Sequence, residues 1–181
     1  MAGPGTTVYD THRARWIEEL VNSNNLKHGV EVGVFKGTTF KHLVKNCPNL
    51  HLTGIDVFCG DKEWRAKKIT TTKELNDLPP VKWYKDLIEF AEEYSERATI
   101  CRDFSNKACE KIKDNSLDFV FIDASHDYKS VLEDIKCWEP KVKKDGIISG
   151  HDIDILEVRR AVQDHKLFFN EAQDNVWYYR K

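Results

Sequence analysis

The sequence predicts an α/β protein with a doubly wound, mostly parallel sheet that closes with an antiparallel strand pair. Short apolar runs typical of buried strands alternate with longer segments whose apolar residues recur at helical spacing. This alternation is typical of a parallel sheet with helices on both faces. We expect its strands at residues 30–34, 50–57, 98–101, 117–122 and 146–149, and the closing pair at 167–170 and 176–180.

The stretch from His28 to Phe58 carries the most specific pattern: a strand, a glycine turn, a helix and a second strand ending in an acid. Gly33 and Gly37 bracket the turn, where glycine allows a positive φ and lets a ligand approach without a Cβ in the way. The helix that begins at Thr38 offers unpaired N–H groups. Asp56 lies about 20 residues beyond the turn, the spacing expected of an acid that accepts hydrogen bonds from two ribose hydroxyls. A unit whose glycines serve only packing is the alternative.

The remaining elements follow in chain order. Residues 1–9 are expected to form a flexible arm. Asp10 or Thr11 could cap a helix that runs to about Asn22, and this helix could cover an edge of the sheet or the mouth of a ligand site. Residues 59–81 are polar and irregular, and they could form a substrate lid or a solvated insertion. Further helices are expected at residues 83–97, 108–112, 129–138 and 156–165.

Composition limits the classes of function. The 181 residues are enough for one domain, which we expect to span residues 1–181. The formal net charge of −2 makes a nucleic-acid partner unlikely on these grounds alone, and no apolar run approaches the length of a membrane span. The five cysteines are scattered and without metal-finger spacing, so we interpret them as reduced thiols of a cytoplasmic protein.

Acidic residues occur at or near the carboxyl end of each of the first five predicted strands. Strand interiors are apolar, so these acids should meet at one edge of the sheet, where open α/β sheets bind their ligands. A single acid there would be a solvated strand end, but five indicate a site. They are Glu31, Asp56, Asp103, Asp123 and Asp152.

Five short motifs, one for each of the first five predicted strands, occur in a specific order along the chain. They are GVEVGVFKGTTF, GIDVF, CRDFS, FVFIDASHDY and DGIISGHDI. Together they resemble a class I S-adenosylmethionine-dependent methyltransferase, which has a Rossmann-like sheet, and are most similar to the small-molecule or sugar O-methyltransferase-like subgroup. The resemblance covers nearly the whole chain. The turn departs from the broad family pattern because Val34 and Phe35 stand where the commoner form has another glycine.

The resemblance implies S-adenosylmethionine as the cofactor and assigns residues to its methionine and ribose. Glu31 and Gly33 would line the methionine end, and Gly37 would permit a close approach. Asp56 would hold the ribose hydroxyls. Carboxylates suit this ligand because it carries a sulfonium and an ammonium group.

The adenine and the methyl group have assignments of the same origin. Phe58, or its neighbour Val57, would pack on the adenine. Asp103 would accept a hydrogen bond from the adenine amino group, with the Phe104 amide near the ring. Asp123 would lie beside the methyl group that is transferred.

Two histidines and a further acid are not explained by cofactor binding. Asp123 and Asp152 follow adjacent strands, where related catechol-type O-methyltransferases hold a divalent cation, so they could bind Mg²⁺ or another divalent metal with an imidazole. Without metal, His126 or His151 could be the general base, and Asp123 completes the catalytic set. The histidines could also serve only to cap or position loops.

The resulting hypothesis is O-methylation of a small-molecule or glycan hydroxyl. The chain lacks the Asn/Asp-Pro-Pro-Tyr block of amino-group DNA methyltransferases and a lysine expected of ribose 2′-O-methyltransferases, which also speaks against nucleic acid. A NAD-dependent oxidoreductase and a non-catalytic nucleotide-binding or interaction protein are the alternatives. A homodimer is left open.

Overall fold

A computed structural model describes residues 11–59 and 69–181 of the chain. Its seven-stranded sheet has the order β3-β2-β1-β4-β5-β7-β6. The strands from β3 to β5 pair in parallel, and β7 runs antiparallel to both β5 and β6. The predicted fold class is therefore confirmed. The strands are β1 (His28–Val32), β2 (His51–Asp56), β3 (Ala98–Arg102), β4 (Leu117–Ile122), β5 (Val142–Gly150), β6 (Asn170–Ala172) and β7 (Val176–Arg180).

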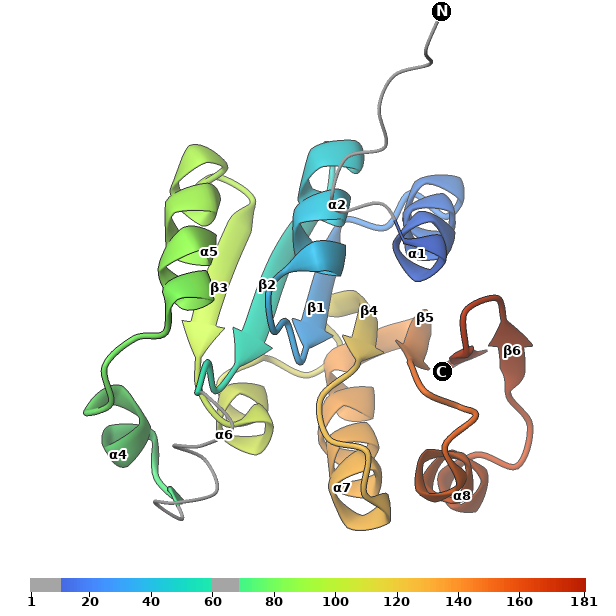
Figure 1. The fold of residues 1–181 in the computed structure, drawn as a ribbon. Helices are drawn as coiled ribbons and strands as arrows, with labels where there is room; N and C mark the ends of the chain where they lie inside the picture. Colours follow the sequence, from blue (N-terminus) through green and yellow to red (C-terminus); the bar gives the residue numbers. More distant parts are fainter. Residues whose placement is uncertain (1–10, 60–68) are drawn as a thin grey trace, which may run out of the picture.

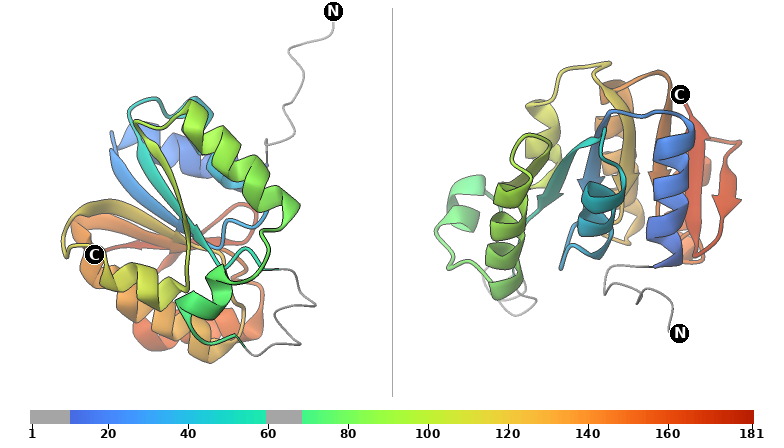
Figure 2. Two further views of the ribbon diagram at one scale, coloured as in Figure 1. Left: turned by 90° about the vertical axis from the view of Figure 1, so that its left-hand side faces the viewer. Right: turned by 90° about the horizontal axis from the view of Figure 1, so that it is seen from above.

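Helices cover both faces of the sheet. Helices α1, α2 and α5 lie on one face, and α6, α7 and α8 lie on the other (Figures 1 and 2). A short helix, α4, lies beyond the carboxyl ends of β2 and β3. The bounds are α1 (His12–Ser23), α2 (Thr38–Asn46), α4 (Thr72–Asn76), α5 (Lys82–Glu93), α6 (Ser105–Glu110), α7 (Tyr128–Trp138), the 3₁₀-helix η1 (Glu139–Lys141) and α8 (Leu156–His165).

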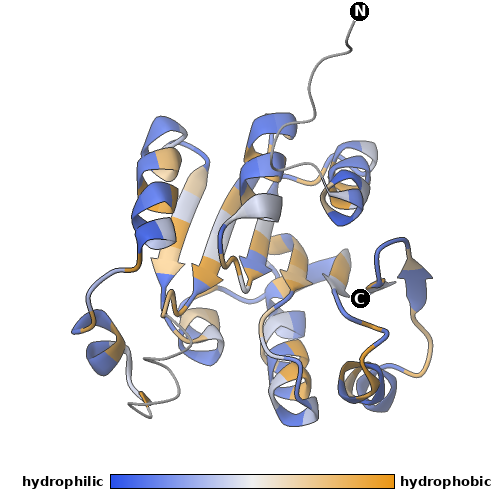
Figure 3. Cartoon of the chain, viewed as in Figure 1, coloured by the Kyte–Doolittle hydropathy of each residue, from blue (hydrophilic) through white to orange (hydrophobic). Residues whose placement is uncertain are grey.

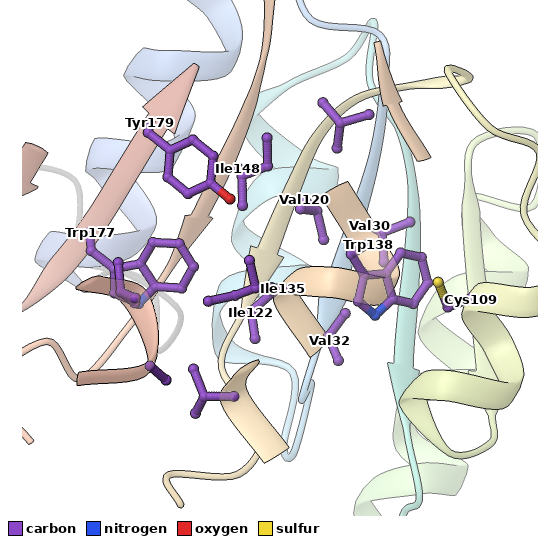
Figure 4. Packing of buried hydrophobic residues seen from close by; sticks show 14 of the residues in the cluster. Val30, Val32, Cys109, Val120, Ile122, Ile135, Trp138, Ile148, Trp177 and Tyr179 are labelled. Atoms are coloured by element: carbon purple, nitrogen blue, oxygen red, sulfur yellow. The ribbon is translucent and has the colours of Figure 1, made fainter. Parts of the chain in front are cut away.

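Each face of the sheet has its own hydrophobic core, because successive strand residues point to opposite faces. Val30 and Val32 belong to the cluster that includes Trp138 of α7 (Figure 4), whereas Phe119 and Phe121 belong to the cluster under α1, α2 and α5. In Figure 3 the parallel strands show much hydrophobic colour, whereas the edge strand β6 is hydrophilic. The helices show both hydrophilic and hydrophobic residues, as amphipathic helices do.

Several predicted boundaries are corrected. The strand expected at 167–170 begins only at Asn170, because Leu167 and Phe168 bend away and are 77% and 82% exposed. The segment 59–81 is not wholly irregular, since a capping box at Thr71 starts α4. Helix α6 begins at Ser105 rather than Ala108. The arm at 1–9 and the basic residues within 60–68 lie outside the described residues.

The expectation of five reduced cysteines is wrong for one pair. Cys109 of α6 and Cys137 of α7 form a disulfide, with 6.3 Å between their Cα atoms, and the other three cysteines are free thiols. Sequence spacing could not find this pair because the two helices meet only in the fold. The cytoplasmic location inferred from the thiols stays a prediction. No helix within residues 11–59 and 69–181 is long and apolar enough to cross a membrane.

Candidate active site

One cavity of about 830 Å³ lies at the carboxyl ends of the parallel strands. The ladder continues beyond the strands to shape it: the Asp123 N–H donates to the Val32 carbonyl at 2.7 Å, and the His151 N–H donates to the Ile122 carbonyl at 3.0 Å. The edge predicted from the sequence is thus a concave site. All five acids line it: Glu31, Asp56, Asp103, Asp123 and Asp152.

The two turn glycines have different structural roles. Gly33 has φ +92°, and a Cβ there would lie 2.1 Å from the Asp123 carbonyl oxygen, so only glycine lets this turn pack against the end of β4. Gly33 lines the cavity, but Gly37 does not. At Gly37 (φ +79°) a Cβ would lie 2.3 Å from Leu87 Cδ2. Gly37 thus makes room for α5, and its role in the approach of the cofactor stays a prediction.

Asp56 anchors the loops on both sides of the cavity floor. Its Oδ2 accepts the Phe35 N–H at 2.8 Å, and its Oδ1 accepts the Phe58 N–H at 2.7 Å. Burial raises the pKa of this carboxyl, and these backbone hydrogen bonds oppose the increase. The backbone N–H groups of Val34 and Val57 lower the pKa of Asp56 in the same way.

The Phe58 ring packs in the core and does not line the cavity. Its side chain is 1% exposed and stacks on Tyr84, with 4.7 Å between the ring centroids. It is absent from the cavity wall, whereas Val57 lines it. Of the two residues considered for the adenine, Val57 therefore faces the cavity, and adenine contact by either residue stays a prediction.

Asp103 is held from three sides. Its Oδ1 accepts hydrogen bonds from the Thr72 hydroxyl (2.7 Å) and the Phe104 N–H (2.8 Å), and its Oδ2 accepts one from Lys111 Nζ (2.6 Å). Burial by itself would raise the pKa of Asp103, but these hydrogen bonds hold it below the ordinary value. Thr72 belongs to α4, so the segment considered as a lid reaches the site. The Phe104 amide is engaged with Asp103.

Glu31 is a deeply buried acid of the cavity that the described part of the protein leaves partly unpaired. The residue is 2% exposed, and its Oε2 has no hydrogen-bond partner among the described residues. Burial raises its pKa well above the ordinary value, and the nearby Asp123 adds to this, whereas Arg13 opposes it. A buried carboxylate oxygen without a partner is unfavourable unless a ligand supplies one.

Two histidines and two acids form a cluster at the ends of β4 and β5. His151 Nδ1 lies 2.9 Å from Asp152 and 3.6 Å from Asp123, and His126 Nε2 lies 2.8 Å from Asp152. Ligand atoms of Asp123, His126 and Asp152 all lie within 4.8 Å of one another. His151 Nε2 is buried without a partner in the described chain. The structure thus brings together all the residues considered for catalysis and for metal.

Arg13 is the residue of this site that the sequence did not reveal. It lies in the first turn of α1, and its Nη1 lies 3.0 Å from Asp123 Oδ2. The guanidinium lowers the pKa of Asp123, although burial, the largest influence, leaves that pKa raised. The helix was expected to cover an edge of the sheet or the mouth of a ligand site, but nothing in its spacing distinguishes this arginine from Arg15.

A family model assigns the chain to a class of protein. A model described as a methyltransferase domain matches residues 30–153, more than half of the chain. The chain therefore belongs to the methyltransferase domain family. It is an S-adenosylmethionine-dependent methyltransferase, as the motif resemblance indicated, and not a NAD-dependent oxidoreductase.

Solved structures agree with this fold. The O-methyltransferase NovP has a TM-score of 0.66 at 15% identity, covering 93% of this chain and 78% of that one. An O-methyltransferase from Bacillus cereus in complex with SAH has a TM-score of 0.61 at 14% identity, with coverages of 97% and 84%. The calicheamicin methyltransferase CalS11 has 0.63 at 12%, with coverages of 93% and 76%. Such identities establish the fold alone. No curated protein matches the chain in sequence.

Proposed function

We propose that this protein transfers the methyl group of S-adenosylmethionine to a hydroxyl oxygen of a small molecule or a glycan. The observation that carries the proposal is the ring of strand-end acids around one cavity. Burial raises the pKa of Glu31, Asp56 and Asp123, so ionising these acids is costly without a cationic partner. A ligand with two cationic groups relieves that cost.

The residues present fit the cofactor. The partnerless Glu31 Oε2 suits its ammonium group. The two Asp56 oxygens suit the ribose hydroxyls, and Val57 and Asp103 remain for the adenine side. When bound, the cofactor supplies a methyl group on a cationic sulfur for in-line displacement. The chain then has to align the acceptor oxygen and exclude water.

We infer that His151 takes the proton of the acceptor. Its Nδ1 lies 2.9 Å from Asp152, so a proton on Nδ1 donates to that carboxylate and leaves Nε2 as the basic nitrogen. This is the usual arrangement of a base oriented by a third group. His126 shares Asp152 from the more exposed side and is the second candidate for the base.

A divalent metal is the alternative means of activating the acceptor hydroxyl. Asp123, His126 and Asp152 would hold it, and their mixed oxygen and nitrogen donors suit Mg²⁺ or, better, a transition metal. Such an ion lowers the pKa of a hydroxyl that binds to it. Arg13 now pairs with Asp123, so this side chain would have to share or release the carboxylate.

The acceptor class rests on analogy with solved structures of the same fold. NovP and the Bacillus cereus protein are O-methyltransferases, and CalS11 is a calicheamicin methyltransferase. The acceptor pocket would come from α1, the described residues 69–81 as a lid and the loops after β4 and β5. A homodimer remains a prediction.

Calorimetric titration with S-adenosylhomocysteine tests the proposal, first in chelator and then with excess Mg²⁺ or Mn²⁺. Micromolar binding supports the cofactor assignment, and tighter binding with metal supports a cation at Asp123 and Asp152. Binding that is indifferent to metal leaves the histidines as the base. The absence of binding under all conditions would refute the proposal.

A further inference from the structure

Two buried atoms of opposite charge lack partners in the same cavity. They are Glu31 Oε2 and Arg13 Nε, and neither has a hydrogen bond within residues 11–59 and 69–181. Both residues line the cavity, and the guanidinium is close enough to lower the pKa of Glu31 against the larger effect of burial. Buried polar atoms are rarely left without a partner, so a carboxylate oxygen and a guanidinium N–H that both lack one indicate a ligand with a cationic donor and an anionic acceptor.

We propose that Arg13 binds the α-carboxylate of the cofactor's methionine group, while Glu31 binds its ammonium group. The inference rests on the proposed function and names a binding residue beyond it. An α-amino acid presents exactly these two charges on one carbon. A guanidinium has five N–H donors, so Arg13 can keep its 3.0 Å contact with Asp123 through Nη1 and still offer Nε to a carboxylate.

The fold holds Arg13 in place before any ligand arrives. The Arg13 N–H donates to Asp174 Oδ2 at 3.0 Å, which ties the start of α1 to the turn between β6 and β7. The Thr11 hydroxyl caps the same turn of the helix by accepting the Ala14 N–H at 3.1 Å. Ala14 and Ile17 are fully buried below. A cation fixed in this way loses little freedom when it binds.

Lys36 provides the matched comparison. It also lines the cavity and carries a positive charge, but it is exposed and lies over the Phe35 ring, with Nζ 5.1 Å from the centroid. Removing its charge changes the net charge of the cavity as much as removing that of Arg13. A specific carboxylate contact should therefore respond to Arg13 alone.

The test compares S-adenosylhomocysteine with its decarboxylated analogue, the 3-aminopropyl thioether, by calorimetry. We expect the wild type to bind the complete compound about tenfold to a hundredfold more tightly. This ratio should fall to about one in Arg13→Gln, recover in part in Arg13→Lys and stay at the wild-type value in Lys36→Gln.

The outcomes separate this inference from the proposed function. Equal binding of both compounds by the wild type would overturn the role of Arg13 but leave the cofactor assignment standing. This comparison uses the wild-type protein alone. An Arg13→Gln protein that keeps the wild-type ratio would also overturn it. A wild type that binds neither compound would refute the proposed function itself.

Discussion

Asp134 of α7 is a carboxyl group that the fold buries beside the cavity. Ser105 donates its hydroxyl hydrogen bond to Asp134 Oδ1, and Trp138 Nε1 donates to the same Ser105 oxygen at 2.8 Å. Burial raises the pKa of Asp134 to about 6, and the Ser105 hydrogen bond only partly opposes this. The group has no ion pair among the described residues.

We expect Asp134→Asn to stabilise the protein at neutral pH. The pKa is about 6 in the folded state and about 3.9 when unfolded, so the folded state binds more protons between these values, and stability falls as pH rises through them. Asparagine cannot ionise, so the variant avoids this loss of unfolding free energy. The resulting gain is at most about 3 kcal/mol above pH 6 and vanishes near pH 4. Urea unfolding at pH 4.5 and 7.5 measures it.

Asp127 on the same helix supplies the control of opposite sign. Hydrogen bonds from Ser125 and Ser130 lower its pKa to about 2, so its contribution to stability is present above pH 4 and is lost as pH falls towards 2. Asp127→Asn should therefore not gain stability at pH 7.5. An Asp134→Asn protein with the same pH dependence as the wild type would contradict the buried-acid argument.

Asp56→Ala and His151→Ala should separate binding from turnover. The first removes the acceptor of the ribose hydroxyls and should weaken S-adenosylhomocysteine binding by about a hundredfold or more. The second should leave binding unchanged and lower kcat about a hundredfold. Calorimetry measures the former, and methyl transfer to an acceptor identified from a panel of phenols and sugars measures the latter.

Asp118 provides the control for Asp56→Ala, which also removes an acceptor of two backbone N–H groups. It also accepts two backbone N–H groups, those of Lys27 and His28, each at 2.8 Å, but at the opposite end of the sheet. Asp118→Ala should destabilise the fold and spare binding. Intact turnover in His151→Ala would remove His151 from the mechanism and leave His126 or a metal.

At the scale of elements, the turn between β1 and α2 requires glycine twice for different reasons. A Cβ at Gly33 meets backbone that cannot move, whereas a Cβ at Gly37 meets the end of the Leu87 side chain. We expect Gly37→Ala to cost about 1–3 kcal/mol and Gly33→Ala more. Urea denaturation of both variants measures the difference.

A double-mutant cycle with Leu87→Ala distinguishes the two causes. Leu87 is fully buried, so its truncation alone costs about 2–5 kcal/mol. In the Gly37→Ala background it should cost less, because the smaller side chain admits the new Cβ. The Gly33→Ala background should show no such coupling. Equal coupling in both backgrounds would contradict the separate roles.

At the scale of the whole molecule, the Cys109–Cys137 disulfide joins α6 to α7 behind the cavity. The two residues are 28 positions apart, and closing a loop of that length stabilises the folded state by about 3.6 kcal/mol. Dithiothreitol should lower the free energy of unfolding by this amount. It should have no effect on Cys109→Ser/Cys137→Ser, whose stability should match that of the reduced wild type.

Thiol titration in denaturant checks the same point directly. Three reactive thiols in the non-reduced protein agree with the bond, because Cys47, Cys59 and Cys101 are the free ones. Five would restore the expectation from the sequence. The result also bears on the cytoplasmic location, since a persistent disulfide is uncommon in a reducing compartment.

The sequence by itself determined the order of strands and helices, the edge at which the acids meet and the class of cofactor. The strands and helices follow from the spacing of apolar residues, and Leu117–Ile122 and Val176–Arg180 have the predicted bounds. The edge follows from position along the chain, because an acid at the carboxyl end of a parallel strand lies where such sheets bind ligands. The class of cofactor could be inferred from the order of the short motifs alone, because each motif has a fixed place on the sheet.

Only the tertiary structure decided which side chains face the cavity and which face the core. Phe58 and Val57 are neighbours, and a single step along the chain turns one ring into the core beside Tyr84 and leaves the other side chain in the wall. Arg13 reaches Asp123 from 110 residues away. Such contacts depend on how helices pack across the sheet, and local sequence carries no record of that packing.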